Sequence, residues 1–250
     1  LAVSFNKIGS VFVAQGRLDE ALRIFEAGLA TSLTQAQTDP QDVRLQRDVS
    51  VSHDRIGSVR VLQGRFDDAL RAFEKSHRIA RSLTLADPQN ARWQLDLATS
   101  SEHIGDVLFA QGRLDDAIRA FEDNIRITRV LSRADPQNAE WQRSLAVSLN
   151  KIGAGRAGRG SSEEALQTFE EGLHIARELG QTDPQNTLWR RGLSVSLDYI
   201  GNVYVSQDRL DDALIAFEES LRIARTLAQT DPQNAEWQRD LAVSFNKIGT

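Results

Sequence analysis

The sequence GRLDDAIRAFE, at Gly112–Glu122, occurs several times in this chain with small changes and at a fixed spacing. GRFDDALRAFE begins at Gly64, GRLDEALRIFE begins at Gly16, and DRLDDALIAFE begins at Asp208. Self-similarity at a fixed period is the sequence signature of repeat architectures. The first property to establish is therefore how far this period extends.

The 48-residue period covers the whole chain. All five prolines fall at one position of the repeat, and an Ile-Gly pair recurs at another. The repeats are 1–48, 49–96, 97–144, 145–192 and 193–240, followed by a partial repeat at 241–250. We expect them to form one domain over residues 1–250. Because the chain contains no Met, we also expect it to be a segment of a longer protein.

Each repeat predicts two helices of about 20 residues, each roughly 30 Å long. Apolar residues from Trp189 to Tyr204 recur at intervals of three or four, and those from Leu210 to Ala224 do the same. Such spacing places them in one stripe on a helix. Glycine ends the first helix, paired acids begin the second, and proline ends it. Four asparagines after the prolines are placed to cap the next first helix: Asn90, Asn138, Asn186 and Asn234.

A helix pair with one apolar stripe on each helix cannot bury that stripe alone, but stacked neighbours can. No strand pattern is present in the sequence. The period therefore predicts an all-α solenoid of antiparallel helix pairs.

These residues resemble the tetratricopeptide repeat (TPR) family. In the last full repeat, Gly201 on the first helix is followed by Tyr204, Ala213, Phe217 and Pro232, which is the order of that family's pattern. The resemblance covers the whole chain and implies a right-handed superhelical solenoid. Ala and Phe are repeated without exception at Ala21, Ala69, Ala117, Ala165 and Ala213, and at Phe25, Phe73, Phe121, Phe169 and Phe217.

The chain departs from the family in repeat length, because units such as 1–48 and 49–96 are longer than the family's repeat of about 34 residues. Half of the extension lies on each side of the proline and is close to two helical turns, so both helices lengthen while their buried faces stay aligned. The extension contributes a Trp, which we interpret as a core residue, at Trp93, Trp141, Trp189 and Trp237. The fourth repeat has an unusual Gly- and Arg-rich stretch, 153–160. We expect its first helix to be frayed or bent there.

Composition excludes several functional classes. The net charge is −5, with 30 basic and 35 acidic residues interspersed along the chain. This favours neither nucleic acid nor a membrane as a partner. No apolar run approaches the roughly 18 residues that a membrane span needs. Cys is absent, which removes thiolate metal sites and cysteine nucleophiles. We expect a cytoplasmic location, although the sequence does not test it.

No catalytic, metal or cofactor pattern stands out. Gly153, Gly155 and Gly158 fit G-x-G-x-x-G, but here the motif ends a helix in an all-helical repeat, whereas a dinucleotide site needs a strand before it. The four histidines, at His53, His77, His103 and His174, form no i, i+4 pair and are interpreted as packing and surface residues. We therefore expect no enzyme activity, no metal and no cofactor.

The candidate site is a double row on the first helices. One row contains amides and acids: Asn6, Asp54, Glu102, Asn150, Asp198 and Asn246. The row beside it is mostly basic: Lys7, Arg55, His103, Lys151, Tyr199 and Lys247. The resemblance implies that both rows face the concave groove. Asn202 is the one residue that fits the position of the family's peptide-carboxylate clamp. Two interpretations remain open, since the rows either bind a peptide or pair with one another.

The sequence thus predicts a protein-interaction scaffold that binds a peptide segment or helix of a partner on the concave face. The alternative is a structural spacer or self-assembling rod. It rests on the expectation that the ends carry no capping helix and stack head to tail.

Overall fold

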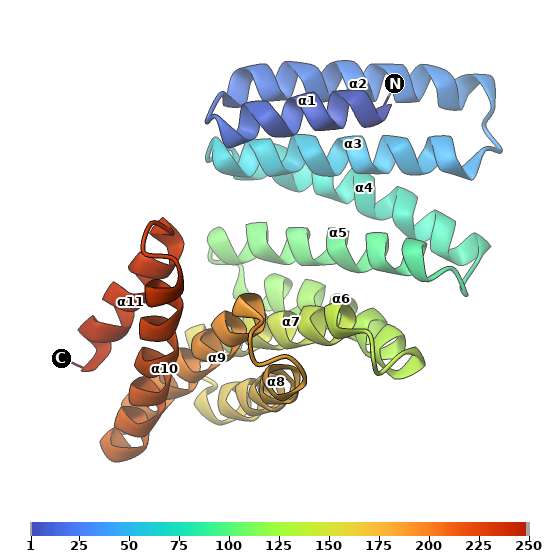
Figure 1. Cartoon of the computed structure of the whole chain (residues 1–250). Coiled ribbons are helices and arrows are strands. Elements are labelled where there is room, and N and C mark those ends of the chain that lie inside the picture. Colours follow the sequence, from blue (N-terminus) through green and yellow to red (C-terminus); the bar gives the residue numbers. More distant parts are fainter. Residues whose placement is uncertain (1, 249–250) are drawn as a thin grey trace. The chain divides into compact units, whose positions relative to one another are not determined.

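The computed structural model describes residues 2–248, and within this range it contains eleven α-helices and no strand (Figure 1). The helices are α1 (Ala2–Ala14), α2 (Leu18–Thr38), α3 (Val43–Leu62), α4 (Phe66–Ala86), α5 (Ala91–Ala110), α6 (Leu114–Ala134), α7 (Ala139–Gly158), α8 (Ser162–Thr182), α9 (Thr187–Ser206), α10 (Leu210–Thr230) and α11 (Ala235–Ile248). Odd-numbered helices are the predicted first helices of the repeats, and even-numbered helices are the second. The all-α prediction is confirmed.

The chain divides into two compact units, an N-terminal unit of residues 1–127 and a C-terminal unit of residues 128–250. In the N-terminal unit, α1 to α5 each pack on the next helix in chain order, and α7 to α11 do the same in the C-terminal unit. First helices of neighbouring repeats also contact one another, α1 with α3 and α7 with α9. Each unit is therefore built as a solenoid of helix pairs. One domain over 1–250 stays a prediction.

The turn inside each pair has the backbone that the sequence predicts. Gly16, Gly64, Gly112 and Gly160 have φ between 71° and 86°. This left-handed conformation is strained for residues with a Cβ. In the fifth repeat Asp208 occupies the same position at φ 59°. The conformation turns the chain within a few residues, so the second helix runs back along the first.

The asparagine caps are confirmed. The Asn138 side chain accepts a hydrogen bond of 3.2 Å from the Trp141 amide. Asn186 accepts from two amides, those of Leu188 and Trp189, at 3.1 and 3.3 Å. These bonds satisfy backbone donors that the first turn of a helix leaves unpaired.

A glycine on the first helix and a phenylalanine on the second hold each pair together. A Cβ at Gly57 would lie 2.5 Å from a ring atom of Phe73, and a Cβ at Gly153 equally close to Phe169. Phe73 and Phe169 are 2% and 0% exposed. The glycine therefore allows the aromatic ring to pack directly against the backbone of the first helix.

Of the fraying or bending expected over 153–160, the fraying is wrong, and the bend stays a prediction. Helix α7 continues unbroken to Gly158, and its 20 residues equal the length of α3, α5 and α9. The Arg156 side chain donates to Thr168 Oγ1 on α8 at 2.7 Å. Gly153 and Gly155 are buried, so tertiary packing offsets the low helix propensity of this stretch.

Candidate functional site

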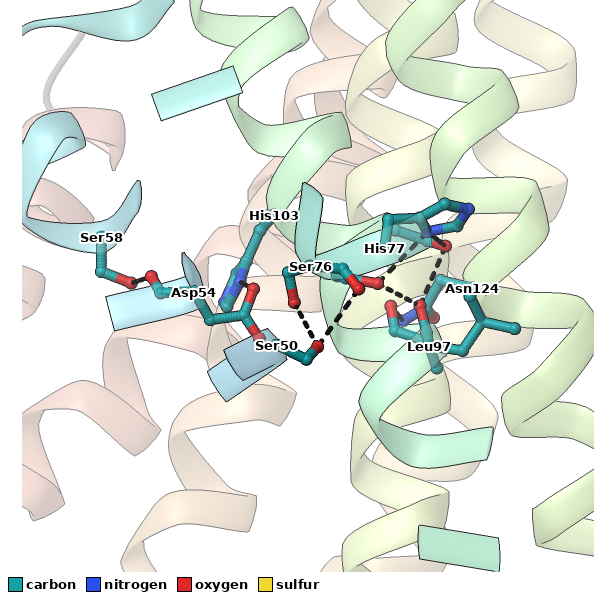
Figure 2. A network of polar contacts seen from close by, with 11 residues as sticks. Ser50, Asp54, Ser58, Ser76, His77, Leu97, His103 and Asn124 are labelled. Atoms are coloured by element: carbon teal, nitrogen blue, oxygen red, sulfur yellow. Dashed lines mark hydrogen bonds and ion pairs between the residues drawn. The ribbon is translucent and has the colours of Figure 1, made fainter. Parts of the chain in front are cut away.

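In the N-terminal unit, two of the predicted groove residues face each other across neighbouring first helices. Asp54 Oδ1 on α3 and His103 Nδ1 on α5 lie 3.7 Å apart, and Figure 2 shows the two side chains converging. The His103 ring also lies 4.7 Å from the ring of Phe73 on α4. Here one residue of each row lies close to the other between neighbouring repeats.

A polar network lies beside this pair (Figure 2). Ser50 Oγ on α3 and Ser76 Oγ on α4 are 2.9 Å apart, and His77 Nδ1 lies 3.2 Å from Ser100 Oγ. Burial lowers the pKa of His77, and it lowers the pKa of His53 to about 4, with Lys75 adding to the effect. Both histidines are therefore neutral near pH 7, which fits the packing role that the sequence indicates.

In the C-terminal unit, Asn150 and Tyr199 are held firmly in place. Asn150 is 7% exposed and donates from Nδ2 to Ser196 Oγ on α9 at 2.8 Å. The Tyr199 ring stacks on Phe169 of α8, with centroids 4.9 Å apart and an angle of 6° between the planes. These two residues are thus oriented before any ligand binds.

The structure places a hollow of about 340 Å³ at these residues. We call it the inner groove, and it lies where α7 and α9 contact one another, with the C-terminal part of α8 as its floor. Its lining from α7 and α8 is Arg143, Ala146, Val147, Asn150, Lys151, Ala176 and Leu179. Its lining from α9 is Leu188, Trp189, Arg191, Gly192, Val195, Ser196 and Tyr199.

Apolar side chains dominate the inner groove, and its charged groups are all cations. Arg191 pairs with Asp240 of α11 at 2.6 Å and with Glu236 at 3.0 Å, and the Asp240 contact raises the pKa of the guanidinium. Arg143 lies 4.0 Å from Glu140 in an exposed pair. Because Arg191 is already paired with two carboxylates, the positive charge of the lining comes from Arg143 and Lys151, and the groove suits an apolar group next to negative charge.

Three further predicted residues meet near the end of the C-terminal unit. The Lys247 ammonium of α11 donates to Asn202 Oδ1 of α9 and lies 5.4 Å from the centre of the Phe217 ring. Burial raises the pKa of Asp198, although Ser220 and Lys247 act in the opposite direction. Lys247 of the basic row is thus bound to Asn202, the residue at the clamp position, and it acts electrostatically on Asp198 of the other row.

The remaining residues of the predicted double row differ in their exposure to solvent. Asn6 is half-buried and Lys7 exposed on α1, Arg55 is exposed on α3, and Glu102 is half-buried on α5. Asn246 is exposed on α11. Gly249, the last glycine of the period, lies outside the described residues.

Sequence reasoning missed Trp189 and Gly192 as groove residues. The four tryptophans are half-buried, whereas the sequence analysis expects them in the core. Trp237 packs against the apolar core of the C-terminal unit, whereas Trp189 lines the inner groove. The sequence signal that could have indicated Trp189 as a groove residue is its place in the extension that lengthens the repeat.

Within residues 2–248, no three His, Asp or Glu side chains cluster closely enough to hold a metal ion. Across the same residues, no helix has the length and apolar character that crossing a bilayer requires.

Comparison with known proteins identifies the repeat. Sequence profiles described as tetratricopeptide repeat match residues 97–137, 193–234 and 11–27. No curated protein matches the sequence.

Solved structures share the fold at low sequence identity. BtubC (BKLC) from P. vanneervenii is 17% identical, with a TM-score of 0.65 over 93% of this chain and 84% of that chain. The nearly identical TPR-like repeats of a putative kinesin light chain from Podosopora anserina are 16% identical, with a TM-score of 0.64 over 91% and 95%. The apo form of RapI is 13% identical, with a TM-score of 0.68 over 99% and 83%.

The matched profiles, the shared fold and the Gly, Ala, Phe and Pro positions of the helix pairs agree with one another. The matched segments are therefore tetratricopeptide repeats, in a chain whose repeats are longer than those of the family.

Proposed function

We propose that this chain is a protein-interaction scaffold that binds a segment of a partner protein in the inner groove and carries out no chemistry on it. The observation that supports this proposal most directly is the hollow between α7 and α9, where three residues of the predicted double row lie: Asn150, Lys151 and Tyr199. A ligand site is typically a concave, mostly apolar surface with a few oriented polar groups.

The lining of the groove indicates the chemistry of the partner. Trp189, Val195 and Leu179 offer apolar contact, and Arg143 and Lys151 lie in the same lining. A peptide or helix with a large apolar side chain next to Asp or Glu complements both features. The binding energy would come mainly from burying the apolar side chain, with the charges guiding orientation.

Gly192 allows a direct test. A Cβ built at this position has no heavy atom within 4 Å, so a larger side chain would enter the groove without displacing its walls. We would select binders from a display library of random 12-residue peptides and measure their affinities by fluorescence anisotropy. Gly192→Phe should weaken the selected peptides by about tenfold or more, which corresponds to about 1.4 kcal/mol.

Gly192→Ala is the matched control, since it adds one methyl group and should change affinity less than about threefold. A second variant, Asn150→Ala with Lys151→Ala, removes two polar groups of the groove. Its folding must be checked by circular dichroism, because Asn150 is buried and bonded to Ser196. Peptides that bind Gly192→Phe as tightly as the wild type would disprove binding in the inner groove.

The second candidate function is end-to-end self-association. Phe245 on α11 is 48% exposed, whereas Leu149 and Leu197 at the same position of the repeat are 2% and 3% exposed. For the 250-residue segment by itself, we place the contact between copies at this exposed apolar side chain of α11. Static light scattering over a range of concentrations distinguishes the candidates, and a constant monomer mass would eliminate self-association.

A further inference from the structure

The C-terminal unit has a second hollow, between the second helices α8 and α10. It has a volume of about 430 Å³, and its floor is formed by α9 through Leu197, Ile200 and Tyr204. We call it the outer groove. Its walls are Glu170, Leu173, His174 and Arg177 from α8, and Asp212, Ile215, Ala216 and Glu219 from α10. None of these residues lines the inner groove.

Ile215 breaks the pattern of the repeat at this groove. The equivalent residues in the first four repeats are polar, namely Arg23, Arg71, Arg119 and Gln167. Ile215 is 66% exposed. A single exposed isoleucine is common on a protein surface, but this one replaces a solvated side chain in the wall of a hollow with apolar residues on its floor.

The same replacement removes a cation from Asp212. In α6, Asp116 forms ion pairs with Arg113 and Arg119, one on each side, and α4 has the same arrangement at equivalent positions. In α10, Asp212 pairs with Arg209 at 2.7 Å, and the second arginine is replaced by the isoleucine. The outer groove therefore has an apolar side chain where a cation is expected, next to a carboxylate that has lost one of its partners.

The two ends of the outer groove differ in their charged residues. Arg177 on α8 and Glu219 on α10 form an ion pair of 3.2 Å, which bridges the two walls at one end. Glu170 and Asp212 occupy the other end and have the same separation along the chain as the bridging pair. Because the bridging pair is neutral as a whole and Asp212 is paired with Arg209, the negative charge of the open end comes from Glu170.

We propose that the outer groove is a docking site for an amphipathic helix of a partner protein, one with an apolar stripe flanked by Lys or Arg. The wall residues recur at intervals of three and four on α8 and α10, so the hollow has the ridged form into which a third helix packs. An apolar side chain of the partner covers Ile215. A cation of the partner takes the place of the arginine missing beside Asp212 and faces Glu170.

The test uses the whole 250-residue chain carrying Gly192→Phe, so that the inner groove is filled. A display library of 16-residue amphipathic helical peptides is selected against this protein, and the recovered peptides are measured by fluorescence anisotropy. The selection should recover peptides with Leu, Ile or Phe at i and i+4 next to Lys or Arg. Adding Ile215→Arg, which restores the residue of the first three repeats, should weaken these peptides at least tenfold.

Two controls separate docking from general attraction to an acidic protein. Peptides with the apolar residues changed to Ser should lose at least tenfold in affinity, and Glu170→Lys should weaken the unchanged peptides at least threefold. The proposal is overturned if no basic amphipathic sequence is enriched, or if the selected peptides bind the Ile215→Arg protein unchanged. It is overturned equally if the Ser-substituted peptides bind as well as their parents. Because the two grooves share no residue, failure here leaves the inner groove untouched.

Discussion

At the scale of single residues, the helical glycines have two different roles. Gly57 is buried, and a Cβ there would overlap the ring of Phe73 at 2.5 Å. Gly192 lies in a helix as well, but a Cβ there meets nothing within 4 Å. The first glycine is thus needed for packing, whereas the second leaves space in the inner groove.

We predict that Gly57→Ala destabilises the protein by about 1–3 kcal/mol, the usual cost of overpacking a well-filled core. The matched control, Gly192→Ala, should stabilise it by about 0.5–1 kcal/mol, because Ala favours the helix. Urea unfolding followed by circular dichroism measures both changes. A Gly57→Ala protein as stable as the wild type would show that Phe73 moves aside at little cost.

His53 predicts how stability depends on pH. Its pKa is lowered to about 4 in the folded chain, mainly by burial, against about 6.5 when unfolded. Between these values the unfolded chain binds more protons than the folded one. Folding stability should therefore fall as the pH drops from about 6.5 to 4 and change little from this cause above that window.

The substitution His53→Leu should remove most of this pH dependence, about 1–2 kcal/mol after allowing for partial solvent exposure. Leucine is the natural choice, because Leu149 and Leu197 occupy the same repeat position and are buried. Part of the pH dependence of folding stability should remain because of His77, since burial lowers the pKa of that residue as well. The free energy of unfolding of the wild type and of His53→Leu, measured at pH 4.5 and pH 7.5, checks this prediction. An equal loss of stability at pH 4.5 in the two proteins would refute it.

At the scale of helices, the sequence predicted where helices end better than it predicted how neighbouring helices pack. Turn glycines and capping asparagines act through the backbone of their own segment, and these local predictions hold. The fraying predicted for α7 is wrong because the prediction considered propensity alone, while packing against α8 holds that helix. The inner groove depends on how α7 and α9 approach each other, and periodicity alone does not give that distance.

Asn186 links a helix end to the groove. It accepts from the amides of Leu188 and Trp189, both of which line the hollow. We predict that Asn186→Ala destabilises the protein by about 0.5–2 kcal/mol and lowers the hydrogen-exchange protection of the first turn of α9. Asn186→Asp keeps an acceptor at the cap and should retain most of the stability. Equal protection in the Ala variant would indicate that packing alone holds the turn.

At the scale of the whole molecule, the repeat places equivalent positions in unequal surroundings. Leu149 and Leu197 are covered by neighbouring helices within the C-terminal unit, whereas Phe245 on α11 is half exposed. A solenoid buries its apolar faces through neighbouring repeats, and under the self-association proposal Phe245 is the contact between copies of the 250-residue segment.

If that contact is a second copy of this chain, Phe245→Glu should abolish a concentration-dependent rise in mass seen for the wild type, since burying an unpaired charge at the contact is costly. Multi-angle light scattering from micromolar to millimolar concentration measures this. Ile215→Arg is the control, because it removes another exposed apolar side chain, from the outer groove, and should leave the rise in mass unchanged. Loss of self-association in both variants would instead indicate that copies meet through the outer groove. A wild-type segment that stays monomeric over this range would rule out its self-association.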